Sequence, residues 1–145
     1  MIEYRKGNLF AEKHPIIAHG VNCQGVMGAG VALIVKTRYP EAYKDYLHFC
    51  SLRDPEHLLG KVRISEDNGQ LIAHMFTQYN TGYSGRFVSY DAVDDCLLDS
   101  RLAEMKLDYI AMPKIGSGLG GGKWEVIEAI INHRLKNHKV VVYEL

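Results

Sequence analysis

Residues 15–35 read PIIAHGVNCQGVMGAGVALIV, and this stretch decides the fold. Its first part, residues 15–21, is an apolar run bounded by proline and glycine, which predicts a buried β-strand. A loop with four glycines follows over residues 20–30. Residues 31–38 then predict a mostly buried helix that ends before Pro40. In α/β proteins this order of elements is typical of the edge of the sheet where ligands bind.

The same order recurs later in the chain. Residues 107–112 predict a short buried strand, and residues 113–124 read PKIGSGLGGGKW, with five glycines. Apolar residues then lie three and four positions apart, which predicts an amphipathic helix. They are Trp124, Ile127, Ile130, Ile131 and Leu135. Two glycine-rich loops at one edge of a sheet would form a cleft between them.

The rest of the chain predicts further strands and helices. The Asp67-Asn68-Gly69 turn joins two strands in a hairpin. The other expected elements are strands at residues 2–4, 61–65, 71–77 and 139–143, and helices at residues 41–50 and 89–105. Together they predict one domain over residues 1–145, an α/β/α sandwich of three layers with a mixed, largely parallel central sheet.

Charge and composition exclude several classes of protein. The 145 residues include 17 Lys and Arg and 17 Asp and Glu, so the chain lacks the basic excess of a general nucleic-acid binder. No apolar run approaches the roughly 18 residues of a membrane span, and the start of the sequence has no signal-peptide pattern. Cys23, Cys50 and Cys96 form no CxxC pair, which predicts a reducing, cytoplasmic setting. Length and neutral charge are compatible with a monomer.

The second glycine-rich stretch indicates phosphate binding. Its glycines let backbone N–H groups approach an anion closely, and the N-terminus of the helix that begins near Trp124 adds positive partial charge. This stretch is not a P-loop, because no Gly-Lys-Ser/Thr ending is present, and it lacks the acidic residue of a Rossmann fingerprint. The amides of Asn22 and Gln24 suit hydroxyl groups such as those of a ribose. The alternative is that the glycines serve tight packing alone.

Few side chains suit catalysis. No metal-ligand motif is visible, so neither a metal nor a cofactor is expected. Strand alternation places His19 on the opposite face of the sheet from Asn22 unless the strand bulges there, and a hydrogen-bonded structural histidine is the alternative. Asp91 is either a general base or a favourable charge in the first turn of a helix. Ser117 contacts phosphate or shapes its turn, and Arg86, in a polar loop, could clamp a terminal phosphate.

Five segments of the chain resemble macrodomains. They are KGNLF (6–10), AHGVNCQGVMGAGVAL (18–33), RYPEAYKDY (38–46), LLGKV (58–62) and MPKIGSGLGGGKW (112–124). Within that family they resemble the branch that contains small ADP-ribose 1″-phosphate phosphatases and the lysine-dependent ADP-ribosyl hydrolases. The resemblance spans essentially the whole chain, and it implies the fold predicted above with ADP-ribose as the ligand.

The resemblance also implies roles for single residues. Asn8 would hold the adenine edge, Asn22 would contact the distal ribose, and Tyr143 would stack on adenine. Backbone amides of residues 25–31 and 116–121 would hold the pyrophosphate and the distal ribose. The expected catalytic residues are His19, Asn22 and Asp91, and the expected ligand-binding residues are Asn8, Leu9, Asn22, Gln24, Gly25, Val26, Met27, Gly28, Gly30, Val31, Thr77, Ile115, Gly116, Ser117, Gly118, Leu119, Gly120, Gly121 and Tyr143.

Three residues depart from the family pattern, and they narrow the range of activities that the resemblance implies. Gln78 stands where the lysine-dependent hydrolases carry their nucleophile, Gly120 where they often carry an acid, and Lys123 where phosphatase-like relatives often carry one. A glutamine cannot form a Schiff base. We therefore expect a cytoplasmic, monomeric enzyme that binds ADP-ribose and hydrolyses the phosphate of ADP-ribose 1″-phosphate, with no membrane or nucleic-acid partner. The alternatives are a non-catalytic ADP-ribose reader and a hydrolase that removes ADP-ribose from modified protein or DNA.

Overall fold

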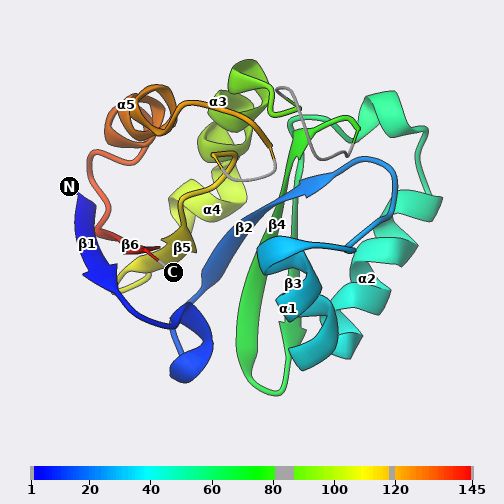
Figure 1. Cartoon of the computed structure of the whole chain (residues 1–145), viewed down its shortest axis with the longest axis horizontal. Coiled ribbons are helices and arrows are strands. Elements are labelled where there is room, and N and C mark those ends of the chain that lie inside the picture. Colours follow the sequence, from blue (N-terminus) through cyan, green and yellow to red (C-terminus); the bar gives the residue numbers. More distant parts are fainter. Residues whose placement is uncertain (1, 81–86, 118–119, 145) are drawn as a thin grey trace.

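A computed structural model describes residues 2–80, 87–117 and 120–144. In this part of the chain, six strands form one sheet in the order β1-β6-β5-β2-β4-β3 (Figure 1). Neighbouring strands are parallel except for β3 and β4, the two arms of the predicted hairpin. The strands are β1 (Ile2–Lys6), β2 (Ile17–Asn22), β3 (Val62–Asp67), β4 (Gln70–Gln78), β5 (Ile110–Pro113) and β6 (Val140–Glu144).

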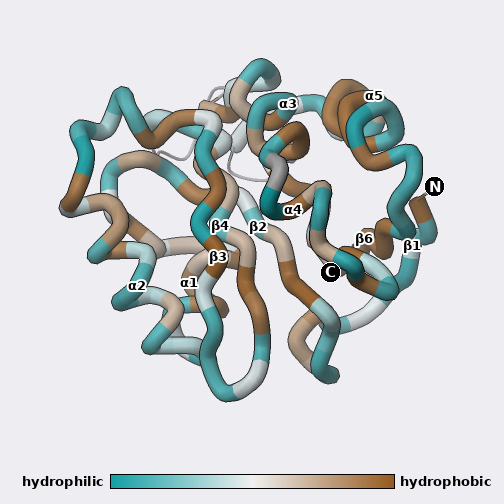
Figure 2. Tube along the Cα trace, turned by 180° about the vertical axis from the view of Figure 1, so that it is seen from behind, coloured by the Kyte–Doolittle hydropathy of each residue, from teal (hydrophilic) through white to brown (hydrophobic). Residues whose placement is uncertain are grey.

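Helices cover both faces of this sheet (Figure 1). One face carries α1 (Gly30–Arg38) and α2 (Pro40–Ser51), and the other carries α3 (Tyr90–Leu98), α4 (Ser100–Glu104) and α5 (Trp124–Arg134). Two 3-10 helices, η1 (Leu9–Ala11) and η2 (Pro55–His57), lie in connections. Each helix layer encloses an apolar core against the sheet, and Figure 2 shows hydrophobic residues along the central strands. The predicted three-layer sandwich with a mixed, largely parallel sheet is confirmed.

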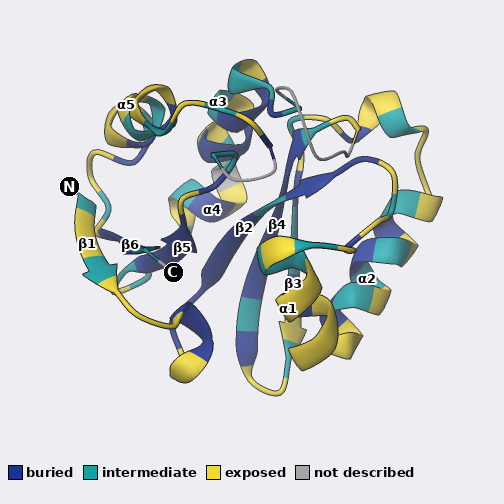
Figure 3. Cartoon of the chain, in the orientation of Figure 1, coloured by how far each residue is buried: buried dark blue, intermediate teal, exposed yellow. Residues whose placement is uncertain are grey.

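Two predicted helices differ from the structure. The helix expected over residues 89–105 is broken at Asp99, whose extended backbone turns the chain and whose carboxylate accepts a hydrogen bond from the Arg101 backbone N–H at 2.9 Å. The prediction that the helix after the first glycine-rich stretch is mostly buried is wrong, because in α1 Val35 alone is buried. This helix packs against α2 and β2, and its other side faces solvent (Figure 3). None of the described helices is both long and apolar enough to span a bilayer.

The end of β2 is irregular. Residues 17–21 pair in register with residues 72–76 of β4, but Asn22 pairs with Gln78, so that the pairing skips Thr77. Such a shift breaks strict alternation and re-aims the side chain that follows it. The structure therefore has an irregularity at the place where the prediction from sequence allowed for one, and the extra residue, Thr77, lies on β4.

Candidate active site

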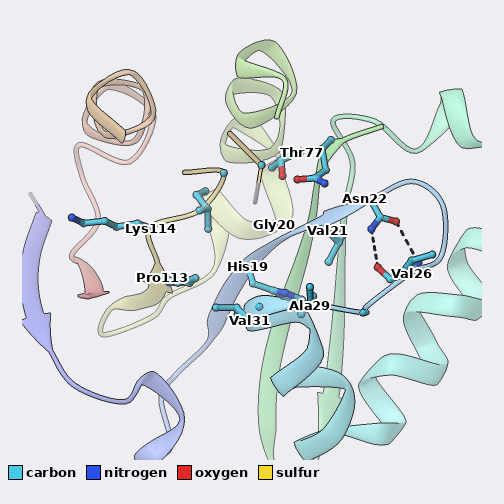
Figure 4. Close-up of a pocket in the computed structure, with 17 residues that line it drawn as sticks. His19, Gly20, Val21, Asn22, Val26, Ala29, Val31, Thr77, Pro113 and Lys114 are labelled. Carbon is cyan, nitrogen blue, oxygen red and sulfur yellow. Dashed lines mark hydrogen bonds between the residues drawn. The ribbon is translucent and has the colours of Figure 1, made fainter. Parts of the chain in front are cut away.

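A cavity of about 260 Å³ opens at the edge where the parallel strands end (Figure 4). Asn22, Gln78 and Pro113, the last residues of β2, β4 and β5, all line it. Its volume is close to the lower end of the range for small-molecule sites, roughly 300–1,000 Å³. The cavity lies between the two loops that the sequence singled out, which we call the first glycine loop (residues 23–29) and the second glycine loop (residues 114–123).

The first glycine loop brings the N-terminus of α1 to the cavity. Ala29, the N-cap residue, and Gly30, Val31 and Ala32 in the first turn line it. Alanine has no side chain that could accept hydrogen bonds from the first N–H groups of the helix, and no side chain among the described residues caps them. These N–H groups and the positive end of the helix dipole form a site for an anion.

Asn22 holds the first glycine loop in shape. Its Oδ1 accepts hydrogen bonds from the backbone N–H groups of Gln24 (2.9 Å) and Val26 (3.3 Å), and its Nδ2 donates to the Val26 carbonyl at 2.8 Å (Figure 4). Behind it, the Tyr46 hydroxyl donates to the Asn22 carbonyl at 2.8 Å. The Asn22 side-chain amide, which was predicted to contact ribose, therefore forms several of its hydrogen bonds with the loop itself.

The second glycine loop folds back on itself. The Gly122 N–H donates to the Gly116 carbonyl at 2.7 Å, and the Val88 N–H donates to the Gly120 carbonyl at 3.0 Å. The Ser117 hydroxyl donates to the Lys114 carbonyl at 2.8 Å, which supports the turn-shaping alternative for this serine. Gly116 and Gly120 line the cavity, whereas Gly121 and the described residues that follow it do not. The helix N-terminus at the cavity is consequently that of α1 and not that of α5.

Two buried polar atoms of residues that line the cavity have no hydrogen-bond partner within the described chain. They are Nδ1 of His19 and Oγ1 of Thr77, and both residues line the cavity. His19 has no exposed surface and Thr77 has 1%. Buried polar atoms in native proteins are nearly always satisfied, by protein, water or ligand. The pair therefore indicates where a bound molecule makes hydrogen bonds.

The structure brings together about half of the predicted site. The predicted residues that line the cavity are His19, Asn22, Val26, Gly28, Gly30, Val31, Thr77, Ile115, Gly116 and Gly120. Those that do not are Asn8, Leu9, Gln24, Gly25, Met27, Asp91, Ser117, Gly121 and Tyr143. Gly118, Leu119 and Arg86 lie outside the described residues.

Several of the residues outside the cavity have structural roles. Asn8 caps η1 by accepting from the Phe10 N–H at 2.9 Å, and Leu9 is fully buried beside it. Tyr143 packs its ring against His14 instead of an open face. Asp91 is exposed in the first turn of α3, so its position supports the helix-dipole alternative and gives no support to a general base.

Sequence reasoning missed some lining residues. Lys114 borders the cavity with a largely exposed ammonium, 3.6 Å from Glu144 Oε1, and Gly20 and Gln78 line it from β2 and β4. The signal for Lys114 was its place directly after the last residue of β5. Cys23 also follows a strand end, but burial raises the pKa of its thiol to about 12, which makes it a poor nucleophile. In the described part of the chain, no three His, Cys, Asp or Glu side chains gather as metal ligands.

Comparison with known proteins agrees with this architecture. The family model for the Macro domain matches residues 18–131. The chain belongs to the macrodomain family. The ADP-ribose 1″-phosphate phosphatase of the yeast Meyerozyma guilliermondii is 32% identical to this macrodomain, and the match covers 97% of this chain and 95% of the yeast protein.

A curated sequence and a solved structure from Mycobacterium tuberculosis are similar as well. The DNA ADP-ribosyl glycohydrolase of Mycobacterium tuberculosis is 35% identical over 88% of this chain, but the match covers only 37% of that longer protein. Among solved structures, the macrodomain of Mycobacterium tuberculosis DarG superimposes with a TM-score of 0.85 at 28% identity, covering 100% of this chain and 98% of that one.

Proposed function

We propose that this macrodomain binds ADP-ribose and hydrolyses the phosphate of ADP-ribose 1″-phosphate. One observation carries the proposal: the cavity joins the uncapped N-terminus of α1 to two unpartnered buried atoms, His19 Nδ1 and Thr77 Oγ1. The helix end suits phosphate oxygens, and the two buried atoms suit hydroxyl groups. A sugar phosphate linked to a diphosphate offers both. The match to a phosphatase over nearly the whole of both chains points the same way.

The reaction needs a proton acceptor and stabilisation of phosphate charge. A water oxygen attacks phosphorus while His19 Nδ1 accepts a proton from that water. The bond between phosphorus and the C1″ oxygen breaks, this oxygen takes the proton that His19 accepted, and ADP-ribose and inorganic phosphate result. Burial lowers the pKa of His19 well below its ordinary value, so the ring is neutral and able to accept, and the nearby phosphate charge favours the protonated ring that forms.

The rest of the site positions the phosphate. The N–H groups at the start of α1 face the charge that develops on the phosphate oxygens, which is the usual form of electrostatic stabilisation. Asn22 acts through the loop that it holds. We assign no role to Asp91.

We also infer a monomer in a reducing, cytoplasmic setting. Cys23, Cys50 and Cys96 are all free thiols, and the formal charge is zero, which supports neither a disulfide-stabilised secreted protein nor electrostatic binding to nucleic acid.

Two measurements on the same protein test the activity. Phosphorus NMR follows release of inorganic phosphate from ADP-ribose 1″-phosphate, and calorimetry measures ADP-ribose binding. Binding together with release supports the proposal. Binding without release leaves an ADP-ribose reader, and absence of binding overturns the assignment of the ligand.

A third measurement addresses the glycohydrolase activity of the mycobacterial relative. Incubation with ADP-ribosylated DNA should leave the modification in place, because Gln78, at the end of β4 in the cavity, cannot form a lysine-type adduct. Release of ADP-ribose from the DNA, without release of phosphate from ADP-ribose 1″-phosphate, would replace phosphatase by glycohydrolase.

A further inference from the structure

A chain of hydrogen bonds runs from the cavity to the surface of the molecule. His19 Nε2 lies 2.8 Å from Nδ1 of His74, and Nε2 of His74 lies 3.0 Å from the Ser65 hydroxyl. That hydroxyl donates to Oδ2 of Asp45 at 2.5 Å. Arg63 holds both carboxylate oxygens of Asp45, at 2.8 and 2.9 Å. The chain links strands β2, β4 and β3 to helix α2.

Burying these polar side chains costs free energy unless each of them forms hydrogen bonds. His19 and His74 have no exposed surface and Ser65 has 5%, whereas the Asp45 side chain retains 28%. Aromatic rings pack around His74, with the Tyr46 ring centroid at 5.7 Å. Every polar side-chain atom of the two rings is bonded within the described chain except Nδ1 of His19, and His19 is the member of the pair that lines the cavity. The chain therefore ends at the ligand site.

Asp45 is the anionic end of this chain, and its charge determines which group donates in each hydrogen bond. The hydrogen bonds from Arg63 lower the pKa of Asp45, which is accordingly a carboxylate and can only accept. The single proton of the Ser65 hydroxyl must point to it, so the Ser65 oxygen accepts from Nε2–H of His74. Burial lowers the pKa of His74 to about 4, although Asp45 opposes this shift, so His74 is neutral.

The position of the proton on His74 also determines the tautomer of His19. Because the proton of neutral His74 sits on Nε2, its Nδ1 is an acceptor and must receive Nε2–H from His19. Burial, together with the neighbouring His74, lowers the pKa of His19 well below its ordinary value. A neutral ring with its proton on Nε2 carries a lone pair on Nδ1.

We propose that Asp45, Ser65 and His74 are positioning residues that hold His19 in the tautomer with a bare Nδ1, so that the cavity receives a hydroxyl of a sugar or a water there and not an ionised phosphate oxygen. A phosphate oxygen without a proton has only lone pairs to offer to this nitrogen, whereas a hydroxyl donates to it. The inference rests on the proposed function for the nature of the ligand, but the tautomer is a property of the protein without ligand.

Nitrogen NMR of histidine-labelled protein tests the tautomer directly, because protonated and bare imidazole nitrogens resonate far apart. The His19 signals are assigned by their loss in His19→Gln. At neutral pH we expect a bare Nδ1 and a protonated Nε2 in the absence of ligand. A proton on Nδ1 of His19 would overturn the proposal.

Asp45→Asn should reverse the direction of each hydrogen bond between Asp45 and His19. The new amide keeps its oxygen on Arg63 and donates from nitrogen to Ser65, which frees the Ser65 proton for Nε2 of His74 and moves the His19 proton to Nδ1. The matched control is Asp94→Asn, which alters another two-oxygen pair, between Asp94 and Arg134 (2.6 and 3.0 Å), on α3 and α5. We expect the fraction of His19 with a proton on Nδ1 to rise in Asp45→Asn and not in Asp94→Asn. Equal spectra in the two variants would refute the relay.

A second pair of variants guards against misfolding. Ser65→Ala removes the hydroxyl, and Ser65→Thr restores it. Phosphate release should fall about tenfold in kcat for Ser65→Ala, as for other residues that orient a functional histidine, with a smaller change in KM and recovery in Ser65→Thr. A parallel fall in both variants would indicate a packing effect and contradict the proposal.

Titration separates the identity of the ligand group from the relay. ADP-ribose should shift the His19 Nδ1 signal because a hydroxyl donates to it, whereas inorganic pyrophosphate should bind near α1 and leave this signal in place. An equal shift with pyrophosphate overturns the assignment of a hydroxyl. Absence of ADP-ribose binding overturns the proposed function instead, while the spectra of the ligand-free protein still decide the relay.

Discussion

In the first glycine loop the absent side chains leave open space, whereas in the second they leave room for neighbouring residues. A Cβ built on Gly30 meets nothing within 4 Å, and one built on Gly28 makes an ordinary 3.5 Å contact. A Cβ on Gly116 would lie 2.7 Å from Val88 Cγ2, and one on Gly122 would lie 2.5 Å from Val88 Cγ1. Two glycine-rich stretches thus have different roles. The first presents a helix end to the ligand, and the second packs the loop onto α5 and the segment before α3.

The largest expected effect comes from breaking the packing of the second glycine loop. Gly116→Ala places a methyl group 2.7 Å from Val88 and 2.9 Å from Ile127, in a backbone with φ of +73°. Overpacking and left-handed strain together should lower the free energy of unfolding by about 2–4 kcal/mol. Urea denaturation measures this change. Gly28→Ala, in the first loop, is the control and should be nearly neutral; equal losses would mean that the two loops are built alike.

The next effect concerns the histidine pair, which lies under the first glycine loop. His74 has a folded pKa of about 4 and an unfolded value near 6.5, so the unfolded chain binds a proton first as the pH falls. Stability is fully present above about pH 6.5 and is lost toward pH 4, by about 2 kcal/mol between pH 7 and pH 5 from His74 alone. His19 shifts in the same direction.

Urea unfolding at the two pH values, with His74→Gln for comparison, checks this prediction. The variant should be less stable at pH 7 but should show a shallower pH dependence than the natural chain. A pH dependence as steep in the variant would assign the effect to groups other than His74.

A third prediction tests the helix end at the first glycine loop. Ala29→Asp places a carboxylate at the N-cap of α1, where it accepts from the first N–H groups and stabilises the helix by about 0.5–2 kcal/mol. The same charge should repel the phosphates of ADP-ribose and weaken binding about tenfold or more. Ala29→Asn has the same shape without the charge, so calorimetry should show a smaller loss. Unchanged affinity in Ala29→Asp would place the diphosphate elsewhere.

The sequence was sufficient for the order of elements and for the position of the cavity, because both follow from short-range patterns. Apolar runs before glycines predicted the ends of β2 and β5, and Asn68-Gly69 predicted the hairpin. The residues placed by resemblance alone fared differently. Asn8 and Tyr143 do not line the cavity, and their side chains cap η1 and pack against His14.

The contact between His19 and His74 could not be predicted from local sequence patterns. His19 and His74 are 55 positions apart and meet only because β2 and β4 pair with these two residues in register. The shift between Val21 and Asn22 likewise exists only once the strands have paired. Alternation along β2 predicted that His19 and Asn22 lie on opposite faces of the sheet unless the strand is irregular. The pairing with β4 shows that irregularity.

The smallest expected effect separates the two atoms without a partner in the described chain, Nδ1 of His19 on β2 and Oγ1 of Thr77 on β4. Thr77→Val keeps the shape of the side chain and removes a buried hydroxyl that has no partner in the described chain. Loss of an unsatisfied polar group should leave stability unchanged or raise it by about 1 kcal/mol. ADP-ribose affinity should nevertheless fall about fivefold, because a hydrogen bond to the ligand is lost. Thermal unfolding and calorimetry on one preparation check both signs. A less stable variant with unchanged affinity would show that Thr77 serves the fold, and would leave His19 as the polar contact at the cavity floor.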